Sequence, residues 1–154
     1  MAENKLLEAK RLWESQYGKD NKAYSGIIIV LANVYGDDNQ AEKAEGLDQE
    51  AKDIGERLFG KNHVYYSTPL HNLATLAMAE KQYEKAEQYL FQSLEMAESI
   101  QSEELILISH SLLAPNYCNQ RKYEKAMPHY FQAIEGFKKS GNKIGLAATY
   151  NQLA

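Results

Sequence analysis

The sequence repeats itself with a period of roughly 40 residues, within the range of known helical repeats. A Leu-Ala pair returns at nearly equal intervals, and two series of small residues return at nearly the same intervals. Three series with nearly one period indicate copies of a single supersecondary unit, each of which buries its apolar face against its neighbours. The series are Leu31-Ala32, Leu73-Ala74, Leu113-Ala114 and Leu153-Ala154; Ala2, Ala44, Ala86 and Ala126; and Ala9, Ala51, Ser93 and Ala133.

Each period has the apolar spacing of two amphipathic helices. From Tyr83 to Ala97 the apolar residues fall three and four residues apart, with Glu and Lys between them. Gly18, Gly60 and Gly141 stand where a helix should end with a positive φ. The predicted helices cover residues 2–17, 22–36, 40–59, 65–80, 83–100, 103–119, 122–140 and 143–154.

Three features test this helical prediction. We place Pro69 near the first turn of its helix, where a missing backbone N–H is tolerated. Pro115 falls late in its helix and removes a hydrogen-bond donor, so that helix is either kinked or broken there. The run from Ile27 to Leu31 has a strand-like composition, but its register with the other repeats favours a helix.

Composition narrows the classes of partner. The net charge is −4 and the basic residues are scattered among acidic ones, so we expect no nucleic acid partner. Cys118 is the single cysteine and no Asn-x-Ser/Thr acceptor occurs, which fits a reducing compartment, and we expect a cytoplasmic protein. The longest apolar run, Ile27 to Ala32, is far shorter than the roughly 20 residues that cross a bilayer, so no membrane partner is expected.

Chemical motifs are weak. Residues 55–61 imitate a phosphate-binding loop, but Asn62 replaces the Mg²⁺-binding Ser or Thr and no strand precedes it. The Gly-Lys pair of this segment recurs in step at Gly18-Lys19, which favours a helix-ending turn. The histidines lack the spacing of metal ligands and fall on different elements, and no catalytic constellation is present. We therefore expect no metal, no cofactor and no enzyme activity. The histidines are His63, His71, His110 and His129.

The Leu-Ala pair followed by Tyr-x-x-Ala, as in Tyr83-Glu-Lys-Ala86 and Tyr123-Glu-Lys-Ala126, resembles the tetratricopeptide repeat along the whole chain. The usual unit has about 34 residues. The longer unit here, with Gly18-Lys19-Asp20-Asn21 and Gly60-Lys61-Asn62-His63 between repeats, is similar to the kinesin light chain subtype. The resemblance implies one all-α domain, a right-handed α-solenoid of antiparallel helix pairs with about eight helices. Repeats at about 22–63, 64–102 and 103–141, with half repeats at 1–21 and 142–154, predict a fragment of a longer array.

The resemblance also implies a function. Family members bind a peptide or a partner protein in a concave groove without chemistry, so we expect a non-catalytic protein–protein interaction scaffold. In kinesin light chain-like members, asparagines just before the Leu-Ala pair hold the backbone of an extended peptide, and Asn72 and Asn151 each fill one such place. A simpler interpretation is that these polar residues only solvate the surface. The groove residues carried over are Ile29, Asn33, Thr68, His71, Asn72, Thr75, Ser111, Asn119 and Asn151.

Two alternatives to the scaffold stay open. The chain is either a ligand-sensing regulatory region of a larger bacterial signalling protein, or an oligomerisation module that self-associates through its open end helices. Solenoid repeats bury their faces only against neighbours, so an uncapped terminal helix predicts association.

Overall fold

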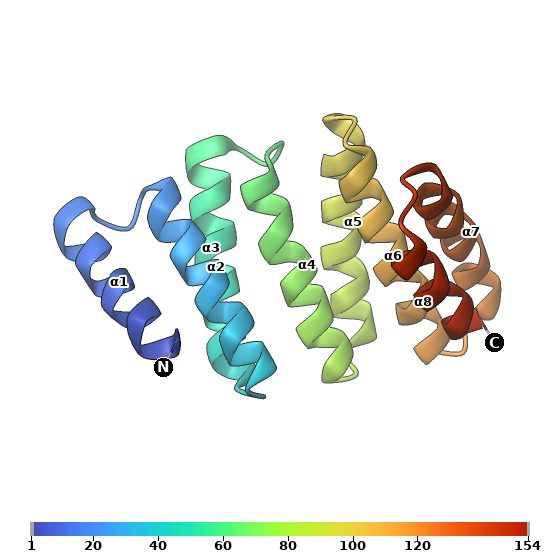
Figure 1. The fold of residues 1–154 in the computed structure, drawn as a ribbon, viewed down its shortest axis with the longest axis horizontal. Coiled ribbons are helices and arrows are strands. Elements are labelled where there is room, and N and C mark those ends of the chain that lie inside the picture. The colour runs from blue at the N-terminus through green and yellow to red at the C-terminus, as the bar shows by residue number, and fades with distance from the viewer. Residues whose placement is uncertain (1, 154) are drawn as a thin grey trace. The chain divides into compact units, whose positions relative to one another are not determined.

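The structure is a computed structural model that describes residues 2–153, with side chains from residue 3 onward. Within this range it contains eight α-helices and no strand (Figure 1). Every described helix end lies within one residue of its predicted position. Met1 and Ala154, which ends the last predicted helix and the last Leu-Ala pair, lie outside the described residues. The helices are α1 Ala2–Tyr17, α2 Lys22–Asp37, α3 Ala41–Phe59, α4 Val64–Ala79, α5 Tyr83–Ser99, α6 Glu103–Asn119, α7 Tyr123–Lys139 and α8 Lys143–Leu153.

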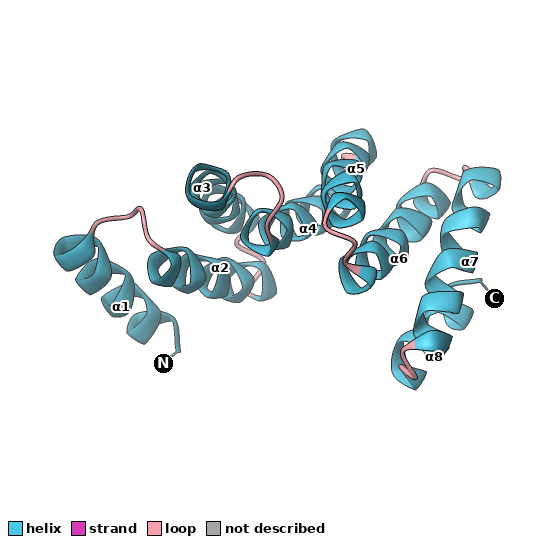
Figure 2. Cartoon of the chain, turned by 90° about the horizontal axis from the view of Figure 1, so that it is seen from above, coloured by secondary structure: helices cyan, strands magenta, loops and turns pink. Residues whose placement is uncertain are grey.

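The chain divides into two compact units after Leu76. The first unit contains α1, α2, α3 and most of α4, and α2 packs between α1 and α3. The second unit contains α5 to α8, where α6 packs between α5 and α7, and α8 packs on α7. Short loops join successive helices in both units (Figure 2). The even-numbered helices begin at nearly equal intervals along the chain, at Lys22, Val64, Glu103 and Lys143, in agreement with the period of the sequence.

The core of the first unit confirms the helical assignment of the strand-like run. Tyr24, Ile28 and Ile29 of α2 pack with Ala51 and Ile54 of α3. A second cluster, formed by Leu31, Tyr35 and Ala44, lies further along the same pair of helices. The recurring small residues are buried in both units, which lets paired helices approach closely. The buried small residues are Ala32, Ala44, Ala74, Ala86, Ala114 and Ala126.

The turns use two kinds of backbone device. Gly18, Gly60 and Gly141 have φ of 73°, 77° and 69°, which confirms the predicted helix-ending glycines. Four other turns place a non-glycine residue in the left-handed region, which sequence reasoning missed; only the asparagine among them is a residue type that favours this region. These residues are Asn39, Lys81, Gln101 and Arg121.

Pro69 and Pro115 lie inside helices, and the structure differs from the prediction for one of them. Pro69 is the sixth residue of α4, so its placement near the first turn was wrong. Pro115 lies inside a helix that is continuous from Glu103 to Asn119, so α6 is not broken. Pro69 has no N–H for the carbonyl of Tyr65, and Gly55 of α3 lies against that carbonyl. A Cβ at Gly55 would stand 2.5 Å from the Tyr65 oxygen, so close helix contact, and no phosphate loop, explains this glycine.

Candidate functional site

A polar cluster joins three helices of the first unit. Asn33 comes from α2, Asp48 from α3 and Asn72 from α4. The Asn72 Nδ2 group donates to Asn33 Oδ1 at 2.8 Å and to Asp48 Oδ1 at 3.0 Å. An amide NH₂ group has two hydrogens, so both are used in these bonds. The cluster is therefore a fixed bridge between helices, built around the residue that the sequence marked as a peptide ligand.

Asp48 is the buried anchor of this cluster. Its side chain is 1% exposed. Burial raises the pKa of Asp48 from 3.8 to about 7, and the hydrogen bond from Asn72 opposes that rise. Ionised or protonated, the carboxyl group offers an acceptor oxygen, so it holds the NH₂ side of Asn72 inward and turns the carbonyl side away. Sequence reasoning missed Asp48, because a lone acidic residue on an outer helix normally faces solvent.

Two polar groups of the cluster remain for a ligand. Asn72 Oδ1 is an acceptor and Asn33 Nδ2 is a donor, and neither has a hydrogen bond among the described residues. Asn33 is exposed and Asn72 is half-buried. One acceptor beside one donor is the complement of a peptide unit, which offers one N–H and one C=O. The geometry suits recognition of a backbone rather than of a charged side chain.

The other predicted residues of the first unit lie in different surroundings. The structure argues against the predicted place of Ile29 in the groove. The Ile29 side chain is 9% exposed and packs in the α2–α3 core, so it does not belong to a ligand surface. His71 is also 9% exposed, and burial lowers its pKa to about 4, so it is neutral at neutral pH. Thr75 is exposed and its Oγ1 donates to the His71 carbonyl at 2.9 Å. Thr68 is half-buried and donates to the Val64 carbonyl at 3.2 Å.

The remaining predicted residues belong to the second unit. Ser111 is half-buried and its Oγ donates to the Ile108 carbonyl at 2.8 Å. Asn119 and Asn151 are exposed, near the end of α6 and on α8 respectively. The structure brings Asn33, Asp48 and Asn72 together, whereas no hydrogen bond joins Ser111, Asn119 and Asn151 within the described second unit.

Two histidines that the sequence left separate meet in the second unit. His110 of α6 and His129 of α7 lie with their Nδ1 atoms 2.8 Å apart. The ring of Tyr117 stacks on His129 with centroids 5.6 Å apart, and the Tyr117 hydroxyl donates to Glu87 at 2.8 Å. Burial lowers the pKa of both histidines. Since the two residues lie on either side of the turn at 120–122, the antiparallel pairing of the helices could have predicted their contact.

Neither histidine lies in a metal-binding group. Among residues 2–153 no set of three or more His, Cys, Asp or Glu side chains could hold a metal ion.

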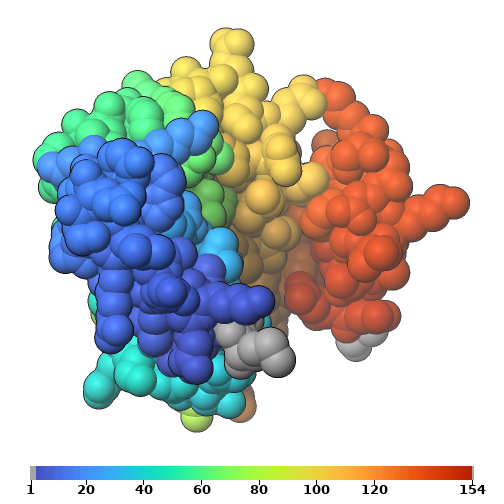
Figure 3. All heavy atoms as spheres, turned by 60° about the vertical axis from the view of Figure 1, so that its left-hand side comes forward, coloured from blue at the N-terminus to red at the C-terminus, as the bar shows by residue number. Residues whose placement is uncertain are grey.

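A groove of about 950 Å³ opens beside this pair. It lies between the first half of α6, the second half of α7 and the loop that leads into α8. Figure 3 shows the hollow between the gold surface of α6 and the red surface of the C-terminal residues. None of the nine predicted groove residues lines it. The lining residues include Glu103, Glu104, Ile106, Leu107, Ile108 and His110 of α6, and Glu135, Phe137 and Lys139 of α7.

Comparison with known proteins identifies the repeat. A family model described as tetratricopeptide repeat matches residues 25–99. The chain also resembles the crystal structure of BtubC (BKLC) from P. vanneervenii, with a TM-score of 0.83 over 92% of this chain and 17% sequence identity. It spans 57% of the length of that solved chain. None of the curated proteins compared gave a match. The predicted all-α helical-repeat fold is confirmed.

The structure also bears on membranes. No helix within residues 2–153 combines the length and the apolar character needed to cross a bilayer.

Proposed function

We propose that the chain, whose residues 25–99 match the tetratricopeptide repeat model, is a non-catalytic scaffold that binds an extended segment of a cytoplasmic partner protein. In this proposal the first unit holds one peptide unit of the partner between Asn33 and Asn72. The observation that supports it most directly is the fixed amide pair, with one acceptor and one donor left unused.

The cluster is preorganised for such a ligand. Asn72 is held by Asp48 and Asn33, so little side-chain freedom is lost when its carbonyl accepts an N–H from the ligand. Asn33 and Asn72 carry no charge, so the affinity of this pair should depend weakly on salt. Each hydrogen bond to a neutral partner contributes about 0.5–1.5 kcal/mol, so the pair fixes the register of a peptide and neighbouring surface adds the rest.

Thr75 extends the same surface. It follows Asn72 by one helical turn on α4, and its side chain is exposed. Its hydroxyl hydrogen is used by the His71 carbonyl, which leaves the oxygen as an acceptor. The surface therefore presents two acceptors and one donor, which favours an extended backbone with N–H groups on the bound edge.

Selection of binders followed by matched substitutions tests this proposal. Extended peptides would be selected from a random library against the whole chain, and their affinities measured by isothermal titration calorimetry. Asn33→Ala should weaken binding by about five- to tenfold, the equivalent of one or two hydrogen bonds. Asn4→Ala, an exposed asparagine on α1, is the matched control and should change nothing. Equal affinities for both variants, with the melting temperature unchanged, would reject the site.

A second candidate is self-association through α8. Ile144 on this helix is 85% exposed, and Tyr150 and Leu153 are exposed as well. Exposed apolar side chains of a helix are covered when a second copy packs on them, and we propose this as the alternative role of the chain. Light scattering over a concentration series decides it: a mass that rises with concentration and falls back in Ile144→Ser supports association, and a constant monomer mass excludes it.

A further inference from the structure

We propose that the groove of the second unit binds a protein segment in which bulky apolar side chains are flanked by Lys or Arg. This goes beyond the proposed function, because every residue that lines the groove belongs to the second unit and none belongs to the asparagine cluster. The inference rests on an apolar floor, an acidic rim and the space between them.

The floor is apolar and its side chains are only half covered. Ile106, Leu107 and Ile108 of α6 line the groove together with Phe137 of α7, and all four are half-buried. Gly136 lets the Leu107 side chain pack directly on α7, since a Cβ there would stand 2.7 Å from Leu107 Cδ1. A groove of about 950 Å³ is at the upper end of the range that takes a drug-sized ligand, so it accommodates two large apolar side chains.

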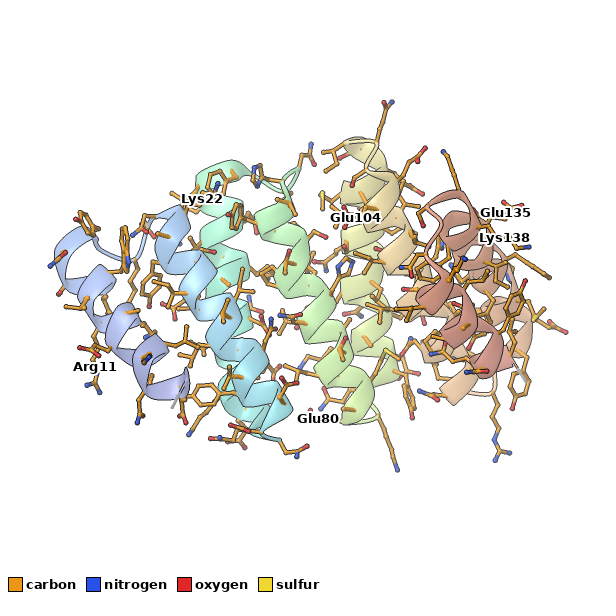
Figure 4. The ribbon with its side chains drawn as sticks, in the orientation of Figure 1. Arg11, Lys22, Glu80, Glu104, Glu135 and Lys138 are labelled. Carbon is orange, nitrogen blue, oxygen red and sulfur yellow. The ribbon has the colours of Figure 1, made fainter. Side chains whose placement is uncertain are left out.

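The rim is acidic. Glu103 and Glu104 stand at the start of α6, and Glu135 stands in the second half of α7. Figure 4 shows Glu104 and Glu135 at the same end of this unit. Lys139 forms a salt bridge with Glu103, whereas Glu104 and Glu135 have no salt bridge among the described residues. The rim therefore keeps two uncompensated negative charges.

Helix stability explains only part of this charge. An acidic residue in the first turn of a helix is favoured by the helix dipole, which accounts for Glu103 and Glu104. Glu135 lies close to the end of α7, where the dipole favours a cation, so its place on the rim gains nothing from that source. His110, beside the floor, is neutral at neutral pH because burial lowers its pKa, and Glu98 of α5 adds further negative charge near it.

This charge selects the occupant. Negative rim charges attract basic side chains and repel acidic ones, so they set specificity and the rate of encounter. The apolar floor supplies the area that a docked segment buries. A segment with apolar residues between Lys or Arg matches both the acidic rim and the apolar floor. An acidic or a wholly polar segment matches at most one of these two features.

Three labelled peptides and a pair of variants test the inference. The probes are the fluorescein-labelled peptide Ala-Lys-Lys-Phe-Leu-Lys-Lys-Ala, the same peptide with Glu for each Lys, and the same peptide with Ser for Phe and Leu. Binding to the whole chain is followed by fluorescence anisotropy. We expect the first to bind at least about tenfold more tightly than either of the others. Raising the salt from about 50 mM to about 300 mM should weaken it severalfold.

The variants separate a groove from general charge. Glu135→Lys should weaken the first peptide about threefold or more, whereas Glu95→Lys, an equal change on an exposed part of α5, should change it less than about twofold. Glu135→Gln, which keeps the shape of the side chain, should give a smaller loss and serves if the lysine variant does not fold. The inference is overturned if the Glu135 and Glu95 variants lose the same affinity for the first peptide. It is also overturned if the acidic peptide binds as tightly as the first peptide, or if the first peptide does not bind. Asn33→Ala should leave binding of the first peptide unchanged. Failure of the groove proposal can therefore be told apart from failure of the proposed asparagine site.

Discussion

Asp48→Asn offers the sharpest test of the cluster in the first unit. Asp48 is buried and its single described hydrogen bond comes from Asn72. Asparagine has nearly the same shape as a protonated aspartic acid, so the substitution removes the charge and leaves the packing. The exposed Asp53 on the same helix provides the matched control, as Asp53→Asn.

The sign of the stability change in Asp48→Asn follows from the shift in the pKa of Asp48. Burial raises the pKa of Asp48 from 3.8 to about 7 in the folded chain. Between these values the folded state binds more protons than the unfolded state, so the stability that this group confers is complete below about pH 4 and is lost as the pH rises to about 7. A difference of about 3 in pKa corresponds to at most about 4 kcal/mol. Since relaxation and water entry lower that ceiling, we expect Asp48→Asn to stabilise the first unit by about 2–4 kcal/mol at about pH 8 and by less than about 1 kcal/mol at about pH 4.5.

Urea unfolding followed by Trp13 fluorescence measures this difference. Trp13 is the single tryptophan and packs against the core of the first unit, so its signal reports that unit. Comparing the variant with the wild type at each pH cancels the other titrating groups. Asp53→Asn should change the free energy of unfolding by less than about 0.5 kcal/mol at both pH values. A gain from Asp48→Asn that is the same at both pH values, or a loss at the higher pH, would refute the reasoning.

Three further predictions concern stability. Gly55→Ala should destabilise the first unit by about 2 kcal/mol or more, because the added Cβ would stand 2.5 Å from a backbone carbonyl oxygen. Gly46→Ala on the same helix meets nothing within 4 Å and should stabilise the unit by about 0.5–1 kcal/mol. Urea unfolding of the two variants measures both changes. Arg121→Gly should stabilise the second unit by about 0.5–1 kcal/mol, since φ there is 59°, and an unchanged or lower midpoint in circular dichroism would contradict it. Ile29→Ala should lower the free energy of unfolding by about 2–5 kcal/mol because Ile29 is a core residue, and Val30→Ala should lower it much less because Val30 is 48% exposed. Similar losses for both variants in urea unfolding followed by Trp13 fluorescence would contradict the burial of Ile29.

The period of the sequence was enough to predict the helices. Leu-Ala pairs and helix-ending glycines recur in step, and each repeat places them in the same local geometry. Positions such as Arg121 could not be predicted, because a tight turn imposes a positive φ on whichever residue stands there. Pro69 shows the same limit: α4 holds a proline beyond its first turn, and the carbonyl of Tyr65 that loses its donor lies against Gly55 of α3.

The candidate site was harder to predict because it depends on helix rotation. Each residue turns the helix by about 100°, so neighbouring positions separate between core and surface. Ile29 lies in the core whereas Asn33 is exposed, although the family pattern assigns both to the groove. Asn72 stays a predicted ligand residue, and its bond to Asp48 joins residues 24 apart in the chain, a contact that no local pattern announces.

Side-chain amide NMR during a peptide titration tests the central claim most directly. Peptides selected against the whole chain would be added to ¹⁵N-labelled protein, and the NH₂ signals of Asn33, Asn62 and Asn72 followed. We predict that the Asn33 signal shifts as its free hydrogens bond the ligand, that the Asn72 signal shifts less because its hydrogens stay on Asn33 and Asp48, and that exposed Asn62 does not move. Saturable binding that leaves the Asn33 signal in place would contradict the proposed site.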